Sequence, residues 1–180
     1  MIKQVCLYCK SHIGFIPEED DPSEKISHGI CLRCTPQFFA GTGASFSNFL
    51  DRFEVPLFVI GPDTCLVDAN ALGKKLVGKE LTQIQGYSGG EVFECVHAEL
   101  PGGCGETIHC KSCTIRKAVT ETATTGQPRF KLPAYMDLGD LMNRRSVHFL
   151  ISTEKVEEMV LLRIDEIRQS SSKTGEDIGS

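Results

Sequence analysis

The sequence lacks tryptophan, long apolar runs and the pattern of a secretory signal. Hydrophobic residues make up 41% of its 180 residues, so a core can form, yet no stretch approaches the roughly 20 apolar residues of a membrane span. The opening residues, 1–6, turn polar before any apolar segment develops. These absences argue against a membrane or secreted protein, and we expect a cytoplasmic one.

The sequence also lacks the excess of basic residues that nucleic-acid-binding proteins show. It has 19 Lys and Arg against 24 Asp and Glu, which gives a formal net charge of -5. Acidic residues gather at Glu18, Glu19, Asp20 and Asp21, and such a segment repels phosphate. We therefore expect neither a nucleic acid nor a membrane as a partner.

Cysteine is abundant, with nine in the chain. In a reducing cytoplasm, closely spaced cysteines indicate metal ligands before disulfides, and an odd count argues against a purely disulfide framework. The ninth, Cys65, lies on an apolar strand segment, and we expect it to be a small core residue. The other eight form two groups of four, which are Cys6, Cys9, Cys31 and Cys34, and then Cys95, Cys104, Cys110 and Cys113.

The first group consists of two C-x-x-C pairs separated by a polar loop at residues 17–23. Two such pairs make a closed tetrahedral site without an open position for substrate. The loop cannot bury enough apolar surface to fold alone, so a metal would supply the missing stability. We predict structural zinc here, with an iron site as the alternative. His12 and His28 could each replace a thiolate, but we expect both at the surface or beside the ligands.

The second group has irregular spacing and a glycine-rich loop around Cys104. Glycine lets the backbone wrap closely around a metal centre, and backbone amides there can donate hydrogen bonds to sulfur. Cys110 and Cys113 precede a predicted helix, whose N-terminus favours thiolates. An iron–sulfur cluster and a zinc ion both remain open for these four cysteines, with a redox disulfide pair as a third reading. Haem attachment is excluded because no C-x-x-C pair is followed by histidine.

Two histidines, His97 and His109, flank the second group. Either could bind the centre or hydrogen-bond to it. The alternative is that both are partly exposed loop residues.

The rest of the chain predicts an α+β domain over residues 45–168. Phe46, Phe49, Leu50 and Phe53 follow the helix period, so residues 45–53 should form an amphipathic helix. We expect a five-stranded antiparallel sheet with short helices on one side. Its strands should span 56–60, 65–69, 130–138, 146–153 and 159–167, although the last segment also fits a helix. Helices should begin at 70, 91 and 114.

The flanking segments complete the organisation. We expect residues 1–35 to form a small zinc-ribbon-like metal module, 36–44 a linker and 169–180 a disordered tail.

Three segments resemble known signalling proteins. The hairpin that ends in Val67-Asp68-Ala69-Asn70, with the order of elements after it, resembles a PAS domain over residues 45–167. The stretch from Ser27 to Cys34, with its upstream C-x-x-C, is similar to a signature found near PAS and receiver domains of bacterial signalling proteins, but lacks that signature's tryptophan. Residues 94–116 resemble a cysteine-bearing subset of bacterial PAS domains. The resemblance implies a sensor that binds a cofactor or ligand between sheet and helices.

The sequence therefore predicts a bacterial sensory protein, responsive to redox state or oxygen through its second cysteine group. No output domain is recognisable, so the signal should pass to a protein partner in trans, with a homodimer through the 45–53 helix as one route. The alternative is a structural or adaptor module with two zinc sites. We do not expect an enzyme, because the thioredoxin arrangement requires a strand before Cys110 that the sequence does not show.

Overall fold

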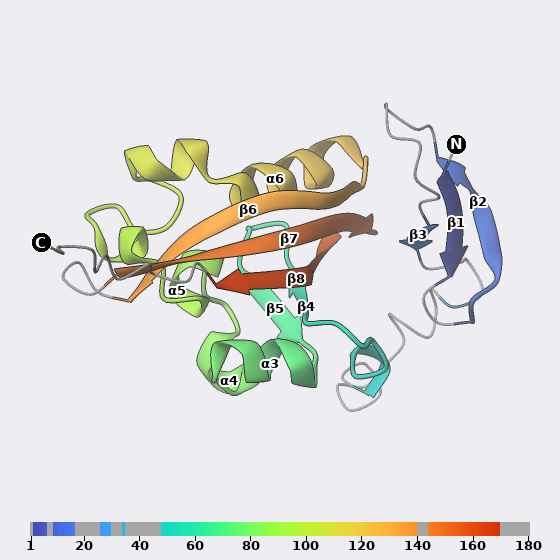
Figure 1. The fold of residues 1–180 in the computed structure, drawn as a ribbon, viewed down its shortest axis with the longest axis horizontal. Coiled ribbons are helices and arrows are strands. Elements are labelled where there is room, and N and C mark those ends of the chain that lie inside the picture. Colours follow the sequence, from blue (N-terminus) through green and yellow to red (C-terminus); the bar gives the residue numbers. More distant parts are fainter. Residues whose placement is uncertain are drawn as a thin grey trace, which may run out of the picture.

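The computed structural model describes residues 2–6, 9–16, 26–29, 34, 48–139 and 144–169. The predicted polar loop at 17–23, the linker at 36–44 and the tail from residue 170 onward lie outside the described residues. The described strands form two separate sheets (Figure 1), one with the strand order β2-β1-β3 and one with the order β5-β4-β8-β7-β6.

The larger sheet confirms the predicted α+β class, and all of its neighbouring strands are antiparallel. The helical alternative for residues 159–167 is wrong, because Val160, Leu162 and Ile164 are all buried on one face with the period of two that a strand requires. The last strand continues to Gln169, one residue beyond the predicted domain end. The strands are β4 (Leu57–Ile60), β5 (Leu66–Ala69), β6 (Arg129–Gly139), β7 (Arg144–Val156) and β8 (Met159–Gln169).

Short helices connect β5 to β6. They are α3 (Ala71–Val77), α4 (Leu81–Ile84), α5 (Gly89–Val92), η1 (Val96–Glu99), η2 (Ile108–Ser112) and α6 (Thr114–Thr125). Sequence periodicity could not predict α4 because a four-residue helix has no repeat; α4 begins instead with a capping box between Glu80 and Gln83. The predicted helix at 91–96 is two elements, α5 and η1, separated by Phe93 to Cys95.

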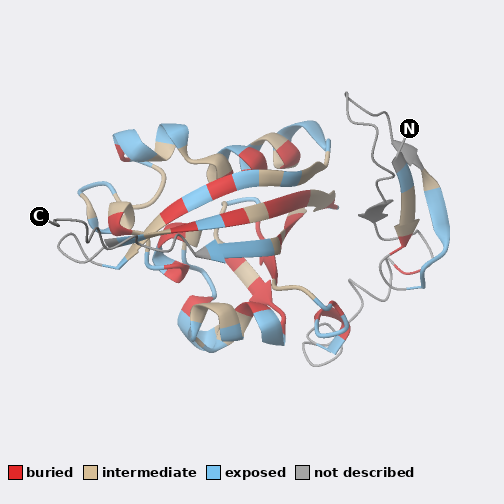
Figure 2. Ribbon diagram, in the orientation of Figure 1, coloured by how far each residue is buried: buried red, intermediate tan, exposed pale blue. Residues whose placement is uncertain are grey.

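The larger sheet has a buried cluster on each face, and Figure 2 shows buried residues recurring along its strands and on α6. On one face, Ile115 and Val119 of α6 pack with Phe149 and Ile151 of β7. On the other face, a helical turn at residues 48–50 brings three apolar side chains against β4 and β8. Those three side chains are Phe49, Leu50 and Phe53. Helices therefore contact both faces, and the apolar residues of the predicted 45–53 helix that are described are buried within the chain.

Asn70 joins the start of α3 to the chain that enters β4. Its side-chain Oδ1 accepts hydrogen bonds from the backbone N–H of Leu57 at 2.9 Å and of Gly73 at 2.7 Å. Its Nδ2 donates to the carbonyl of Val55 at 2.8 Å and to that of Phe53 at 3.4 Å. The side chain is 1% exposed, so water cannot replace these bonds.

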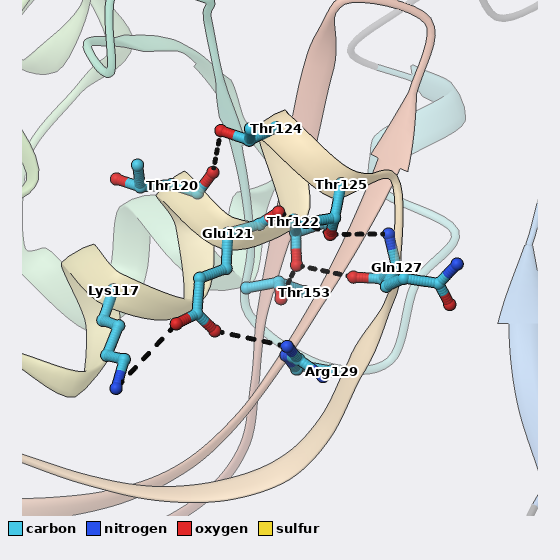
Figure 3. Close-up of polar contacts among 9 residues, drawn as sticks. All are labelled: Lys117, Thr120, Glu121, Thr122, Thr124, Thr125, Gln127, Arg129 and Thr153. Carbon is cyan, nitrogen blue, oxygen red and sulfur yellow. Dashed lines mark hydrogen bonds and ion pairs between the residues drawn. The ribbon is translucent and has the colours of Figure 1, made fainter.

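The C-terminal end of α6 is hydrogen-bonded to the sheet through buried hydroxyls (Figure 3). The Oγ1 atoms of Thr122 and Thr153 lie 2.7 Å apart, and Thr122 also donates to the carbonyl of Gln127. Gly126 adopts φ +72° and ends the helix. Glu121 of α6 lies 3.3 Å from Arg129 of β6. These contacts fix α6 across β6 and β7.

The smaller sheet pairs β1 (Ile2–Cys6) antiparallel with β2 (His12–Ile16) and parallel with β3 (Ile26–Gly29). Gln4 of β1 donates from Nε2 to Oε1 of Glu154 on β7 at 3.5 Å, which is a contact between the two sheets. No helix in the part of the chain that the structure describes is long and apolar enough to cross a lipid bilayer.

Replacing Asn70 with Ala should destabilise the protein by about 2–4 kcal/mol, because it leaves buried backbone donors and acceptors without partners. Urea unfolding followed by circular dichroism measures the effect. Asn48→Ala is the matched control, since Asn48 is exposed. Equal unfolding midpoints for the two variants would contradict the role assigned to Asn70.

Replacing Glu154 with Gln should remove a pH dependence of stability. Burial raises the pKa of the Glu154 carboxyl from 4.5 to about 8, although the charge of Arg163 opposes the shift. The folded protein therefore holds a proton that the unfolded chain releases, and stability present below pH 4.5 is lost as the pH rises towards 8. At pH 9 Glu154→Gln should be more stable than the native protein by about 2 kcal/mol, less than the full shift implies because the side chain is partly exposed.

The two proteins should unfold at the same urea concentration at pH 4. Glu158→Gln changes an exposed position in the turn between β7 and β8. This control should unfold at the same urea concentration as the native protein at both pH 4 and pH 9. A Glu154→Gln variant no more stable than the native protein at pH 9 would contradict the raised pKa.

Candidate functional site

Three cysteines of the first group meet at the end of β1. The Sγ atoms of Cys6, Cys9 and Cys34 all lie within 4.8 Å of one another, and Cys6 and Cys34 are buried. The backbone N–H of Lys10 donates a hydrogen bond to the carbonyl of Cys6 at 2.8 Å. Cys31, the fourth predicted ligand, lies outside the described residues.

This sulfur cluster suits one metal ion. A Zn–S bond of about 2.3 Å in a tetrahedron places neighbouring thiolates roughly 4 Å apart, close to the observed grouping. His12 is exposed on β2, as expected for a surface residue. His28 lies in β3.

The four cysteines of the second group line one cavity of about 290 Å³, between the larger sheet and the segments that cover it. Cys95 precedes η1, Cys104 lies in the loop between η1 and η2, Cys110 lies in η2 and Cys113 caps α6. The cavity has an apolar lining from the sheet, α5 and α6, whose members include Ile60, Leu66, Phe93, Ile115, Met136 and Leu162. Thiols and apolar groups together form a partly dry site that suits a soft metal centre.

Glycine makes room for Cys104. A Cβ atom on the buried Gly90 of α5 would lie 2.7 Å from Sγ of Cys104 and 2.9 Å from its Cβ, so only glycine fits there. The loop around Cys104 contains three glycines at positive φ. These are Gly102 (+96°), Gly103 (+73°) and Gly105 (+105°), and they confirm that the backbone bends sharply around this cysteine.

Cys110 has two polar contacts at its sulfur atom. The backbone N–H of Gly105 donates to its Sγ at 3.1 Å, and the Thr107 hydroxyl lies 3.2 Å from the same atom. Burial opposes ionisation of the Cys110 thiol, but these contacts and the charge of Arg116 together lower its pKa below the usual value. The site therefore favours a thiolate at this position, which is the form that binds metals.

The pKa of the Cys95 thiol is shifted in the opposite direction, because burial dominates there. Burial raises the pKa of the Cys95 thiol, with a further contribution from the nearby thiols of Cys113 and Cys104, against the lowering effect of amide hydrogen bonds from residues 97 and 98. Cys95, Cys104 and Cys113, which come from separate segments, all line the cavity.

The spacing of the two cysteine groups differs. Among the described residues, Cys6, Cys9 and Cys34 are the only potential metal ligands that form a set of three or more within 4.8 Å. All four cysteines of the second group are described, so their sulfur atoms are spread more widely around the cavity.

The two predicted histidines stack on each other at the cavity. The ring centroids of His97 and His109 lie 4.0 Å apart with an angle of 14° between the planes. His97 lies with Nε2 3.7 Å from Asp137 of β6, and its Nδ1 is buried without a hydrogen-bond partner among the described residues. His109 is exposed and His97 is partly exposed. Both line the cavity together with the four thiols.

Sequence reasoning missed three residues of this site, namely Gly90, Thr107 and Arg116. Gly90 and Thr107 belong to no motif, and only the folded chain brings Gly90 to Cys104. The position of Arg116, three residues after Cys113, did indicate that its side chain lies on the same side of α6 as the thiol, since residues three apart in a helix share a face.

Cys65 is not the core residue that the sequence predicted. It is partly exposed next to the turn that follows β4, and its backbone bridges to Ser88. The strand β5 begins one residue later, at Leu66, so Cys65 stays outside the buried pattern.

Comparison with known proteins gives similarities of fold only. No protein family model and no curated protein sequence matches the chain. Among solved structures, the PAS domain of a Desulfitobacterium hafniense protein matches with a TM-score of 0.39 and 17% identity over 68% of this chain and 98% of that one. The Rhodobacter sphaeroides LOV protein matches with a TM-score of 0.44 and 15% identity, over 73% and 68%.

The PAS domain of nitrogen regulation protein NR(II) from Vibrio parahaemolyticus has a TM-score of 0.43 and 12% identity, over 68% of this chain and 95% of that one. At these values the similarities carry no conclusion about function. The PAS-like description rests on the five-stranded antiparallel sheet and its short helices.

Replacing Gly90 with Ala should displace Cys104 and destabilise the protein by about 1–3 kcal/mol, because the added methyl group collides with the cysteine. Gly89→Ala in the same helix is the matched control, since a Cβ there meets nothing within 4 Å. Thermal unfolding and metal content of the purified proteins measure both effects. The assignment fails if the two alanine variants behave alike.

Proposed function

We propose that the chain is a PAS-type sensory domain whose input site is the cavity lined by Cys95, Cys104, Cys110 and Cys113. The single observation that carries the proposal is the convergence of these four thiols, from three separate segments, on one cavity between sheet and helices. The fold alone supports no function. The chemistry of this donor set supports a metal or redox centre.

An iron–sulfur cluster fits this cavity better than a single zinc ion. One zinc ion draws its thiolates to roughly 4 Å from one another, as the first group allows. The second group is spread more widely around about 290 Å³, which suits a larger centre held at its corners by cysteines. When bound, such a cluster exchanges an electron at a potential set by its surroundings. The chain's part is to hold it, to donate hydrogen bonds to sulfur and to limit water.

The first group has a different role in this proposal. Cys6, Cys9 and Cys34, with Cys31, would hold a zinc ion that stabilises a small sheet with little core of its own. With four thiolate ligands, this site would have no position for a substrate. Its role is structural.

The signal would leave the domain through α6 and the sheet. Cys113 caps α6 at one end, and Thr122 near its other end is hydrogen-bonded to Thr153 of β7. A change at the cysteines that shifts α6 must therefore move groups on β7. The readout would be a protein partner in trans or a second copy of the chain, and it requires that the two states differ in their interaction energy with that partner.

Anaerobic purification with metal, sulfide and visible-absorption analysis tests the proposal. We expect zinc at the first group, together with iron, acid-labile sulfide and visible absorption from the second. Cys104→Ala and Cys113→Ala should lose the absorption and keep the zinc, whereas Cys9→Ala should lose zinc and keep the absorption.

Cys65→Ala is the matched control, because Cys65 is a partly exposed thiol outside both groups, and it should keep both signals. A colourless protein with zinc at both groups would contradict the redox role. That result would favour the alternative function, a structural or adaptor module.

A further inference from the structure

Arg116 brings a positive charge into the thiol-lined cavity. It lies in the first turn of α6, three residues after Cys113, and is partly buried in the cavity lining. Its guanidinium packs directly on the glycine loop, because a Cβ on Gly105 would lie 2.3 Å from one of its terminal nitrogens and 2.7 Å from its central carbon. The glycine at this position therefore makes room for the arginine.

Among the described residues, no carboxylate lies within ion-pair distance of Arg116. The carboxylate that the described residues contribute to the cavity lining, Asp137, already accepts a hydrogen bond from Ser146 at 2.5 Å and lies beside His97. A partly buried arginine without a counter-charge is costly unless an anion balances it.

The charge of Arg116 acts on Cys110, whose Sγ also accepts from Gly105, the residue on which the guanidinium rests. Four thiolates around one centre leave a net negative charge there, and Arg116 is the cation placed to balance it. In a site with apolar walls, this interaction is stronger than it would be in water.

We propose that Arg116 sets the charge balance of the second cysteine group and thereby the potential at which its centre accepts an electron. The inference rests on the proposed function. Reduction adds one electron, supplied by an external one-electron reductant such as dithionite, and breaks no bond. Because a nearby positive charge stabilises the more negative, reduced state, loss of that charge makes reduction harder.

Redox titration of the full chain, purified anaerobically, tests this role. Arg116→Gln should lower the midpoint potential. At a fixed potential, the ratio of oxidised to reduced centre should rise about tenfold, and for one electron this ratio corresponds to a shift of about 59 mV. Arg116→Lys retains the charge and should restore most of the native value. Lys117→Gln is the matched control, because it removes a positive charge from the next position of α6, where the side chain is exposed and points to Glu121; its midpoint should equal that of the native protein.

An iron-loaded Arg116→Gln protein with an unchanged midpoint would overturn this inference and leave the proposed function intact. A site that holds zinc and shows no visible absorption would overturn both. If Arg116→Gln does not retain iron, Arg116→Lys decides the question. Retention of iron by the lysine variant supports the charge role, and its loss in both variants overturns that role in favour of packing.

Discussion

The side chain of Asn70 is the interaction on which the larger domain depends. Its amide satisfies backbone groups of Phe53, Val55, Leu57 and Gly73, which belong to the chain before β4, to β4 and to α3. These segments could not pack so closely without a partner for their buried polar groups. Gly73 completes the arrangement, since a Cβ there would lie 2.8 Å from the carbonyl oxygen of Leu57. These bonds hold the chain before β4, the start of β4 and the start of α3 together.

That covering layer is where the thiol-lined cavity forms. α5, η1, η2 and the start of α6 are short, and glycine-rich turns rather than long packed helices join them. Such a layer leaves space above the sheet that apolar side chains do not fill. The cysteines, Arg116 and the two stacked histidines surround this space, so the polar chemistry of the domain is concentrated at its least regular part. On the opposite face, Phe49, Leu50 and Phe53 pack in a cluster with residues of β4 and β8.

The strands could be predicted from the sequence because each carries a pattern of apolar residues that can be recognised without knowing the rest of the fold. In β7, Val147, Phe149 and Ile151 alternate with more exposed residues, and the structure buries those three. β8 was ambiguous because its apolar residues satisfy both a helical and an extended period, and pairing with β4 and β7 decided it. α6 was predictable despite its threonines, since Gly126 marks its end. The shortest helices depend on local caps and were not predictable from periodicity.

The cysteine pattern by itself determined which residues could hold metals, because a C-x-x-C pair brings two thiols together within a single turn. The pattern could not determine how two such turns, or three separate segments, approach one another. Only tertiary packing decided that Cys6, Cys9 and Cys34 come within 4.8 Å while the second group surrounds a cavity. Packing also brought Gly90 against Cys104 and seated Arg116 on Gly105. The physical reason is that ligand type is a property of each residue, whereas the size and charge of a site depend on distances between segments that are far apart in the chain.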